Sequence, residues 1–226
     1  MLKLAPILLA LAYGLLAHRF SIRRTQRELD DKSTELADPI LDVHLKTMAR
    51  ALGVGRIPVY IYEIEPVNGL ADTGGRVFIT RGFFRKYRAG QVTAEELTSV
   101  IAHELGHVAL GHSRRRMVDF SGQNALRMTL GMILGRFIPF LGWYIAEMLT
   151  RLVAARLSRG DEYEADAYAA ALLTKSGIGI APQISLFTKL ERLTGAGGPP
   201  LAWLASHPKA QDRIDALQAL QLRWQE

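Results

Sequence analysis

The spacing of apolar residues along the chain predicts helices in two well-marked segments. Asp38 followed by Pro39 is typical of a helix start, and apolar residues then recur at helical spacing over residues 40–52. Thr93 and Glu96 have the spacing of a capping box, in which each side chain accepts a hydrogen bond from the backbone of the other residue. The sequence therefore predicts one helix that starts at Pro39 and a second that starts just after Thr93.

Two short runs between these helices have the composition of β-strands. Residues 59–62 are β-branched and aromatic, and residues 76–80 alternate polar with apolar side chains. Part of the link between them is our candidate for an exposed edge strand, which could bind a substrate backbone as a further strand. The residues of this candidate strand are Asn68, Gly69, Leu70 and Ala71. The predicted fold class is α+β, mostly helical with a small β-sheet.

The first residues of the chain predict a membrane anchor. Residues 4–17 carry no charge, and they lack the pattern of small residues that precedes the cleavage site of a signal peptide. Basic residues are more numerous after this run than before it, which predicts a cytoplasmic body held at the cell membrane by one N-terminal segment. We therefore divide the chain into an anchor over residues 1–20, a polar tether over residues 21–38 and a folded domain over residues 39–226.

A second apolar stretch, residues 128–149, allows three interpretations. Its length would permit a membrane span, but Arg136, Pro139 and several glycines interrupt it, and a charge in the middle of a bilayer costs free energy. The stretch could also lie on the bilayer or cover the active site. We predict instead a pair of helices buried in the protein core.

The composition narrows the classes of function. The chain of 226 residues has no cysteine, so any metal would need histidine and carboxylate ligands, which favours a catalytic site. The formal net charge is +6, but the basic residues are dispersed and no stacking aromatic residues alternate with them. This pattern argues against a nucleic-acid partner, and a surface that faces a membrane explains the excess charge better.

The clearest chemical motif is His103-Glu104-Leu105-Gly106-His107. Residues four apart lie on one face of a helix, so both imidazoles can bind one cation while Glu104 reaches a water molecule beside it. The flanking residues are apolar, and a buried glutamate between two histidines costs free energy unless it is paired or binds a metal. The motif predicts a catalytic zinc site with one Zn²⁺ ion per chain.

A third zinc ligand is expected, because catalytic zinc usually has three protein ligands. The best candidates lie in residues 158–170, where Glu162 and Asp166 are one helical turn apart. One carboxylate can bind the metal while the other accepts a hydrogen bond from a ligand histidine. From the residues alone, Glu164 remains an alternative to Glu162 as the ligand. His112 lies off the ligand face and is interpreted as a structural or supporting residue.

These motifs together resemble those of the HtpX and CAAX prenyl protease group of zinc peptidases, metallopeptidase family forty-eight. The segments that carry the resemblance are H-E-L-G-H, the pattern S-R-x-x-E-Y-x-A-D from Ser158, residues 68–80, and His207-Pro208 with Arg213-Ile214. The resemblance implies a zincin-like gluzincin domain with the sheet beside the active-site helix. It implies Glu162 as the third zinc ligand beside His103 and His107, with Asp166 behind the ligands. It also implies proteolysis in membrane-protein quality control or peptide processing.

His207 and Arg213 each have more than one interpretation. Either could be catalytic by donating to the carbonyl oxygen, on which negative charge develops during amide hydrolysis. His207 could instead occupy the open zinc position in a resting state, or cap the helix that follows. Arg213 could instead pair with a carboxylate. The sequence leaves these alternatives open.

The sequence as a whole predicts a membrane-associated zinc metalloendopeptidase that cleaves proteins or peptides. Glu104 would act as the general base and then as the acid that protonates the leaving amine. A zinc-binding membrane scaffold or chaperone without turnover is the alternative, and a nucleic-acid binder is the weakest interpretation. Neither the natural substrate nor the oligomeric state follows from the sequence.

Overall fold

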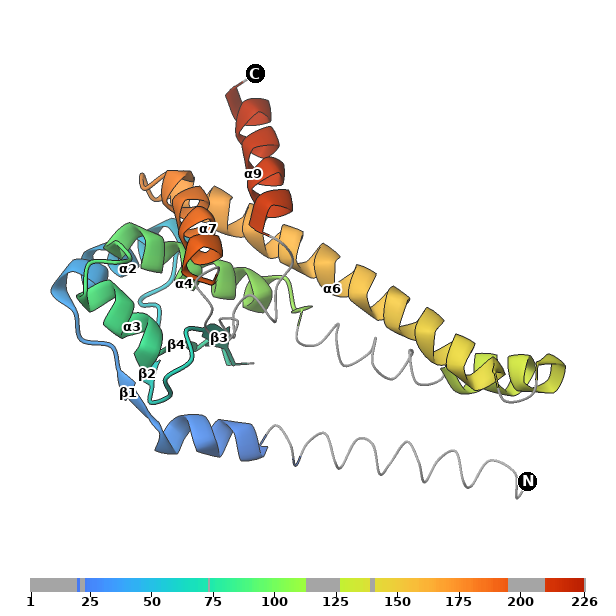
Figure 1. The fold of residues 1–226 in the computed structure, drawn as a ribbon. Helices are drawn as coiled ribbons and strands as arrows, with labels where there is room; N and C mark the ends of the chain where they lie inside the picture. Colours follow the sequence, from blue (N-terminus) through green and yellow to red (C-terminus); the bar gives the residue numbers. More distant parts are fainter. Residues whose placement is uncertain are drawn as a thin grey trace.

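The structure is a computed structural model that describes Phe20 and residues 23–72, 74–112, 127–138, 141–194 and 210–225. A helix-rich body contains the small sheet, and one long helix projects from this body to one side (Figure 1). The predicted membrane anchor, apart from Phe20, and the candidate site residue His207 lie outside the described residues.

Both predicted helix starts are confirmed. The Asp38 side chain accepts hydrogen bonds from the backbone N–H groups of Ile40 and Leu41 at 3.0 and 3.1 Å. Thr93 and Glu96 form the two hydrogen bonds of a capping box, at 3.2 and 2.8 Å. The helices are α2 (Pro39–Leu52), α3 (Arg81–Arg88), α4 (Ala94–Ala109), α6 (Gly142–Lys175), α7 (Ala181–Thr194) and α9 (Ala210–Gln225), with further helical residues at 23–31 and 127–137.

The sheet confirms the predicted strands and adds one that was missed. Its strands are β1 (Ser33–Glu35), β2 (Val59–Tyr62), β3 (Gly69–Ala71) and β4 (Val77–Thr80), in the order β1-β2-β4-β3. Strands β2 and β4 are parallel, and each outer pair is antiparallel. The stretch at residues 21–38, interpreted as a polar tether, contains β1 and the buried Leu29. Polar residues alone did not reveal β1, because its conformation depends on pairing with β2.

Helix α4 lies at the centre of the body, which explains why its polar motif is buried. It packs against α2, α6, α7 and β3, and most residues of its first three turns are buried. Apolar side chains from these elements form one core around it, among them Leu97, Ile101 and Leu173. The sheet lies beside α4 as expected. The predicted fold class, mostly helical α+β with a small sheet, is confirmed.

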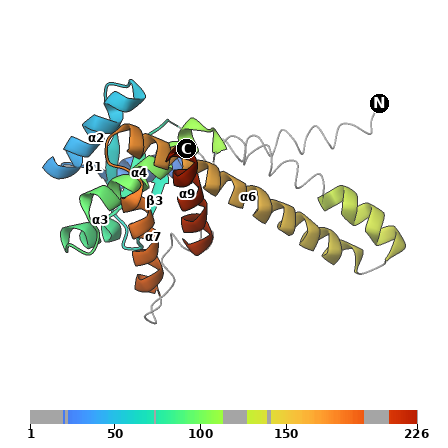
Figure 2. The ribbon, with the colours of Figure 1, turned by 90° about the horizontal axis from the view of Figure 1, so that it is seen from above.

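The second apolar stretch corrects a prediction. We expected residues 128–149 to form a helical pair buried in the core, but the helix at 127–137 and the first half of α6 extend away from the body (Figures 1 and 2). Many of their large apolar side chains are exposed, with Phe137 at 75%. Apolar composition did not distinguish a core from an exposed apolar face. Within the described part of the chain, no helix combines the length and apolarity needed to cross a bilayer.

Candidate metal centre

The two motif histidines of α4 turn the same ring nitrogen toward each other. Nε2 of His103 lies 3.1 Å from Nε2 of His107, and the two rings are nearly perpendicular. His103 is 2% exposed, and Glu104 between the two histidines is 5% exposed. Polar groups this deeply buried need protein or metal partners, because water does not solvate them.

Glu162 of α6 brings a carboxylate to both histidines. Its Oε2 atom lies 3.4 Å from Nε2 of His103, and its Oε1 atom lies 3.5 Å from Nε2 of His107. A tetrahedral ion with ligand bonds of about 2.0–2.2 Å holds its ligand atoms roughly 3.3–3.6 Å apart. The observed separations of 3.1, 3.4 and 3.5 Å are close to this range. The donor set of His103, His107 and Glu162 therefore fits a metal ion.

Asp166, one turn after Glu162 on α6, supports His103 from behind. Its Oδ1 atom accepts a hydrogen bond from Nδ1 of His103 at 2.9 Å. Arg213 of α9 donates to both carboxylate oxygens, with each distance 2.6 Å, and Gln183 of α7 donates at 3.3 Å. Because an ionised carboxylate only accepts, Nδ1 of His103 must carry a proton. The lone pair of the neutral ring is then on Nε2, the atom that faces the other candidate ligands.

The electrostatics of this cluster favour a positive charge between its carboxylates. Burial would lower the pKa of His103, but hydrogen bonds to Asp166 and Glu162 outweigh burial and raise this pKa to about 9. Burial would likewise raise the pKa of Asp166, but the charge of Arg213 and the hydrogen bonds from Arg213 and His103 hold it below its usual range. A metal ion would supply positive charge at the same place, with Nε2 of His103 unprotonated.

The second ligand histidine has a different support. Nδ1 of His107 lies 2.8 Å from Nδ1 of His112, and Nε2 of His112 lies 3.1 Å from Oε2 of Glu164. These distances fit two hydrogen bonds in series, in which Nδ1 of His107 donates to His112 and Nε2 of His112 donates to Glu164. The lone pair of His107 is then on Nε2. His112 is 1% exposed. It therefore fits the supporting position that the sequence analysis allowed, and Glu164 faces it rather than the ligand cluster.

Gly106 allows α4 and α6 to approach closely between the two histidines. A Cβ atom at this position would lie 3.0 Å from the carbonyl oxygen of Ala165 and 3.3 Å from Cβ of Tyr168. Such distances are tighter than ordinary van der Waals contact, so a side chain here would push the helices apart. Glycine within the motif therefore helps to bring Glu162 within reach of the histidines.

The edge strand β3 lies along α4 beside the motif glutamate. A Cβ atom built on Gly69 would lie 2.8 Å from Cγ1 of Val100 and 3.4 Å from Oε1 of Glu104. The absence of a side chain at Gly69 thus lets the strand run close to the Glu104 carboxylate. The candidate residues Asn68, Gly69, Leu70 and Ala71 are at an edge of the sheet, as expected.

Of the two roles that the sequence analysis gave for Arg213, the geometry fits pairing with a carboxylate. It is fully buried, pairs with Asp166, and its guanidinium carbon lies 4.2 Å from the centre of the Phe187 ring. This geometry is the carboxylate pairing that the sequence analysis gave as the alternative to a catalytic role. Gln183 was missed altogether, because a glutamine on an ordinary helix carries no sequence signal of its contact with Asp166.

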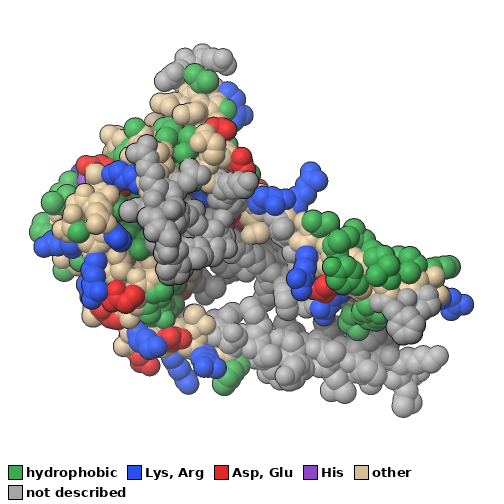
Figure 3. All heavy atoms as spheres, viewed as in Figure 1, with side chains coloured by type: hydrophobic (Ala, Val, Ile, Leu, Met, Phe, Trp, Pro, Cys, Tyr) green, Lys and Arg blue, Asp and Glu red, His purple; other side chains and the backbone are tan. Residues whose placement is uncertain are grey.

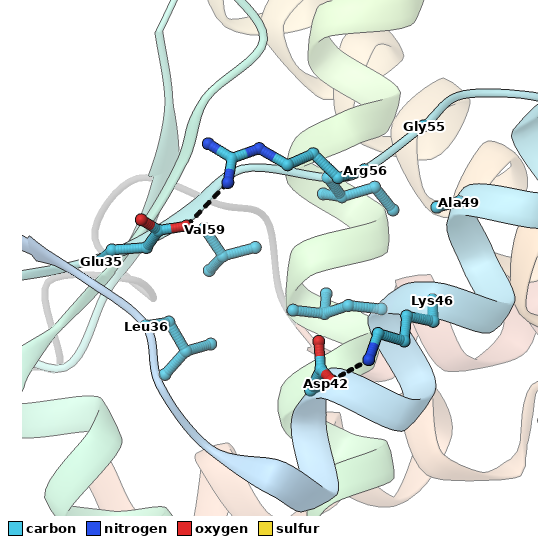
Figure 4. Close-up of a pocket in the computed structure, with 10 residues that line it drawn as sticks. Glu35, Leu36, Asp42, Lys46, Ala49, Gly55, Arg56 and Val59 are labelled. Carbon is cyan, nitrogen blue, oxygen red and sulfur yellow. Dashed lines mark hydrogen bonds and ion pairs between the residues drawn. The ribbon is translucent and has the colours of Figure 1, made fainter.

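A pocket of about 250 Å³ lies apart from these residues, between α2, the end of β1 and the segment that leads into β2 (Figure 4). Its walls are aliphatic side chains and two ion pairs, Glu35 with Arg56 at 3.0 Å and Asp42 with Lys46 at 2.6 Å. The four charged groups satisfy one another, and none of the lining residues belongs to the histidine cluster. The candidate metal centre is therefore the histidine cluster between α4 and α6 rather than this pocket.

Two histidines and a glutamate on one helix, joined by a carboxylate from a second helix, define a metallopeptidase site. The chain belongs to peptidase family M48, whose sequence model matches residues 35–221. It is accordingly a metalloprotease, with a metal ion and with protein or peptide substrates.

Individual relatives agree with this assignment. The chain is 31% identical to the metalloprotease LoiP of Escherichia coli (strain K12) over 197 residues, which cover 85% of this chain and 75% of that protein. It is 30% identical to the metalloprotease YcaL of the same organism over 178 residues, 77% of this chain and 67% of that protein. It is 26% identical to the beta-barrel assembly-enhancing protease of Yersinia pestis over 204 residues, which cover 83% of this chain and 40% of that protein.

Proposed function

We propose that this chain is a zinc-dependent endopeptidase in which His103, His107 and Glu162 hold one Zn²⁺ ion. The observation that carries the proposal is the set of three ligand atoms at mutual separations of 3.1 to 3.5 Å, close to those around a tetrahedral ion. The absence of cysteine and the choice of two imidazoles with one carboxylate suit a catalytic rather than a structural zinc ion.

The chemistry that follows from this ligand set is hydrolysis of a peptide bond. When bound, zinc lowers the pKa of a water molecule and polarises the scissile carbonyl. Glu104, buried on the same helix between the two histidines, accepts a proton from the attacking water and later delivers it to the leaving amine. Asp166 and His112 hold the two imidazoles in the tautomer whose Nε2 lone pair faces the ion.

We propose that Arg213 is a positioning residue, which fixes the Asp166 carboxylate and through it the ring of His103. Its pairing behind the cluster supports this role over direct donation to the substrate. For His207 the role remains the one proposed from the sequence, either donation to the carbonyl oxygen or occupation of the open zinc position in a resting state.

The substrate backbone is proposed to add to the exposed edge of β3. Extended peptides commonly bind to proteases and other domains as an added strand. The proximity of Gly69 to the Glu104 carboxylate would place such a strand next to the general base.

The setting is proposed to be the cell membrane, with residues 1–20 as an anchor, a cytoplasmic catalytic domain over residues 39–226, and a role in membrane or envelope protein quality control. The apolar N-terminal sequence supports the anchor. The name of one relative, the beta-barrel assembly-enhancing protease of Yersinia pestis, supports the envelope role.

The deciding experiment compares Glu104→Gln with the wild-type protein and with Glu95→Gln. Glu95 lies on the same helix but is 46% exposed, so it controls for loss of a charge on α4. Glu104→Gln should bind the metal with unchanged stoichiometry and lose at least about 100-fold in casein or peptide cleavage, whereas Glu95→Gln should cleave normally. Cleavage by Glu104→Gln at the wild-type rate would overturn the assignment of the base.

The second candidate, a zinc-binding scaffold or chaperone without turnover, makes the opposite prediction. It requires metal binding without peptide cleavage in the wild-type protein. Cleavage that disappears with a chelator and returns with added zinc would exclude it.

A further inference from the structure

The most exposed apolar surface of the described chain is on the projecting arm, which we define as residues 127–138 and 141–157. Most of the large apolar side chains that the described residues expose belong to this arm. The six most informative, Met132, Phe137, Leu141, Trp143, Tyr144 and Leu152, are between 51% and 75% exposed. Figure 3 shows apolar side chains gathered along the projecting arm.

The arm has a well-packed interior of its own, so its apolar exterior is not a sign of poor packing. A Cβ atom on Gly131 would lie 2.5 Å from the ring of Trp143, and one on Gly142 would lie 2.4 Å from the backbone of Gly135. Ala146 is fully buried. The two helices therefore pack almost backbone to backbone and against one face of the Trp143 ring, whereas side chains such as Phe137 and Tyr144 remain exposed.

Isolated apolar residues on a surface need no explanation, but a contiguous apolar face marks an interaction site. The charges of the arm indicate which partner fits. Arg136 and Arg156 are exposed, whereas Glu147 is the one acidic residue within the arm and is paired with Arg127 and Arg151 at 3.3 and 2.8 Å. The arm is thus apolar and basic, a combination that favours a lipid surface with anionic headgroups.

The distribution of aromatic residues points to the same partner. Phe137, Trp143 and Tyr144 lie within a few residues of the ends at which the two helices of the arm come together in sequence, and this end of the arm is far from the body (Figure 2). Tryptophan and tyrosine are enriched at the boundary between headgroups and acyl chains, because their rings are apolar and carry one polar group.

We propose that the arm inserts its apolar face into the headgroup and acyl boundary of a bilayer that contains anionic lipid. This contact is distinct from the N-terminal anchor, and no step of it requires peptide hydrolysis. Because Trp143 and Glu162 are on the same continuous helix, the arm places the candidate metal centre about 28 Å along α6 from the lipid-facing tip. The helix then acts as a spacer that sets the distance between membrane and active site.

The test uses the full chain and a reporter within the arm, so that lipid binding by the N-terminal segment does not confuse the result. The chain has three tryptophans, and Trp203→Phe with Trp224→Phe leaves Trp143 as the single emitter. Vesicles of phosphatidylglycerol and phosphatidylcholine with brominated acyl chains should shift its emission to the blue and quench it. Vesicles of phosphatidylcholine alone should quench it less.

Two matched pairs of substitutions sharpen this test. Phe137→Glu with Tyr144→Glu should abolish the quenching, whereas Ile40→Glu with Val43→Glu, which changes similarly exposed residues of α2, should leave it unchanged. Arg136→Glu with Arg156→Glu keeps the apolar face and should reduce quenching only in the anionic vesicles.

Two results would overturn the proposal. One is an unchanged emission of Trp143 in a chain that co-sediments with the vesicles, because another segment would then hold the membrane. The other is a dimer in lipid-free solution that Phe137→Glu with Tyr144→Glu converts to monomers, because the face would then belong to a second copy of the chain.

Discussion

The two halves of α6 have opposite surroundings although they form one continuous helix. The first half carries Trp143, Tyr144 and Leu152 into solvent, whereas the second half buries Glu162 and Asp166 almost completely. The apolar residues are thus outside and the acidic residues inside, the reverse of the usual distribution in a soluble protein. The buried carboxylates belong to the candidate metal centre, and the exposed apolar residues belong to the proposed membrane contact.

The reason for the difference lies in the partners of each half. Glu162 and Asp166 are tolerated in the interior because histidines and an arginine from α4 and α9 surround them. The apolar residues of the arm have no protein surface to cover them within the described chain. Substitutions in the two halves should therefore have very different effects.

The largest effect is expected for Glu162→Ala in the buried half. It removes one of three metal ligands and should weaken zinc binding by more than about 100-fold, the upper range for loss of a supporting residue. The measurement is zinc content and competition with a chelator. Glu164→Ala is the matched control, since its side chain is 51% exposed and faces His112. Zinc loss by Glu164→Ala together with retention by Glu162→Ala would reverse the assignment of the third ligand.

Asp166→Ala should destabilise the fold as well as the metal site. It removes the carboxylate that pairs with the buried Arg213, and breaking a buried ion pair by removing one partner costs about 3–5 kcal/mol. Urea unfolding of the metal-free protein measures this change separately from metal binding. Asp215→Ala on α9 removes an exposed carboxylate and should change the free energy of unfolding by no more than about 0.5 kcal/mol. Equal effects of the two substitutions would show that the Asp166–Arg213 pair contributes nothing to stability.

An intermediate effect is expected for His112→Ala, which removes the partner of His107. Loss of the residue that orients a ligand histidine costs about 10–100-fold in metal affinity. The control is His44→Ala on α2, whose nearest carboxylate in an ion pair is Glu95 at 3.6 Å. Metal affinity in His112→Ala equal to that in His44→Ala would contradict a supporting role for His112.

The smallest effect is expected in the arm. Leu152→Gln replaces a side chain that is 59% exposed, so the free energy of unfolding should change by no more than about 0.5 kcal/mol. Thermal unfolding in lipid-free buffer measures it. A loss of several kcal/mol would mean that this face is covered in solution, and the contrast between the two halves of α6 would then be smaller than the structure indicates.

Much of the local structure and part of the site could be predicted from residues near one another in the chain. The caps at Asp38 and Thr93 start helices through contacts that span two or three residues. The His103–Glu104–His107 spacing places two imidazoles on one face by helical geometry alone. By contrast, β1 was missed, because its partner β2 is far along the chain and its own residues are polar.

The sequence by itself determined the helix that carries two ligands and a base, because one turn of an α-helix sets that geometry. Only the tertiary structure decided that Glu162 rather than Glu164 faces the histidines, that Arg213 pairs with Asp166, and that the apolar stretch forms an exposed arm. These outcomes depend on contacts between residues far apart in the chain, such as His103 and Asp166, which are separated by 63 positions. Helical periodicity describes which side chains share a face, but not which element that face meets.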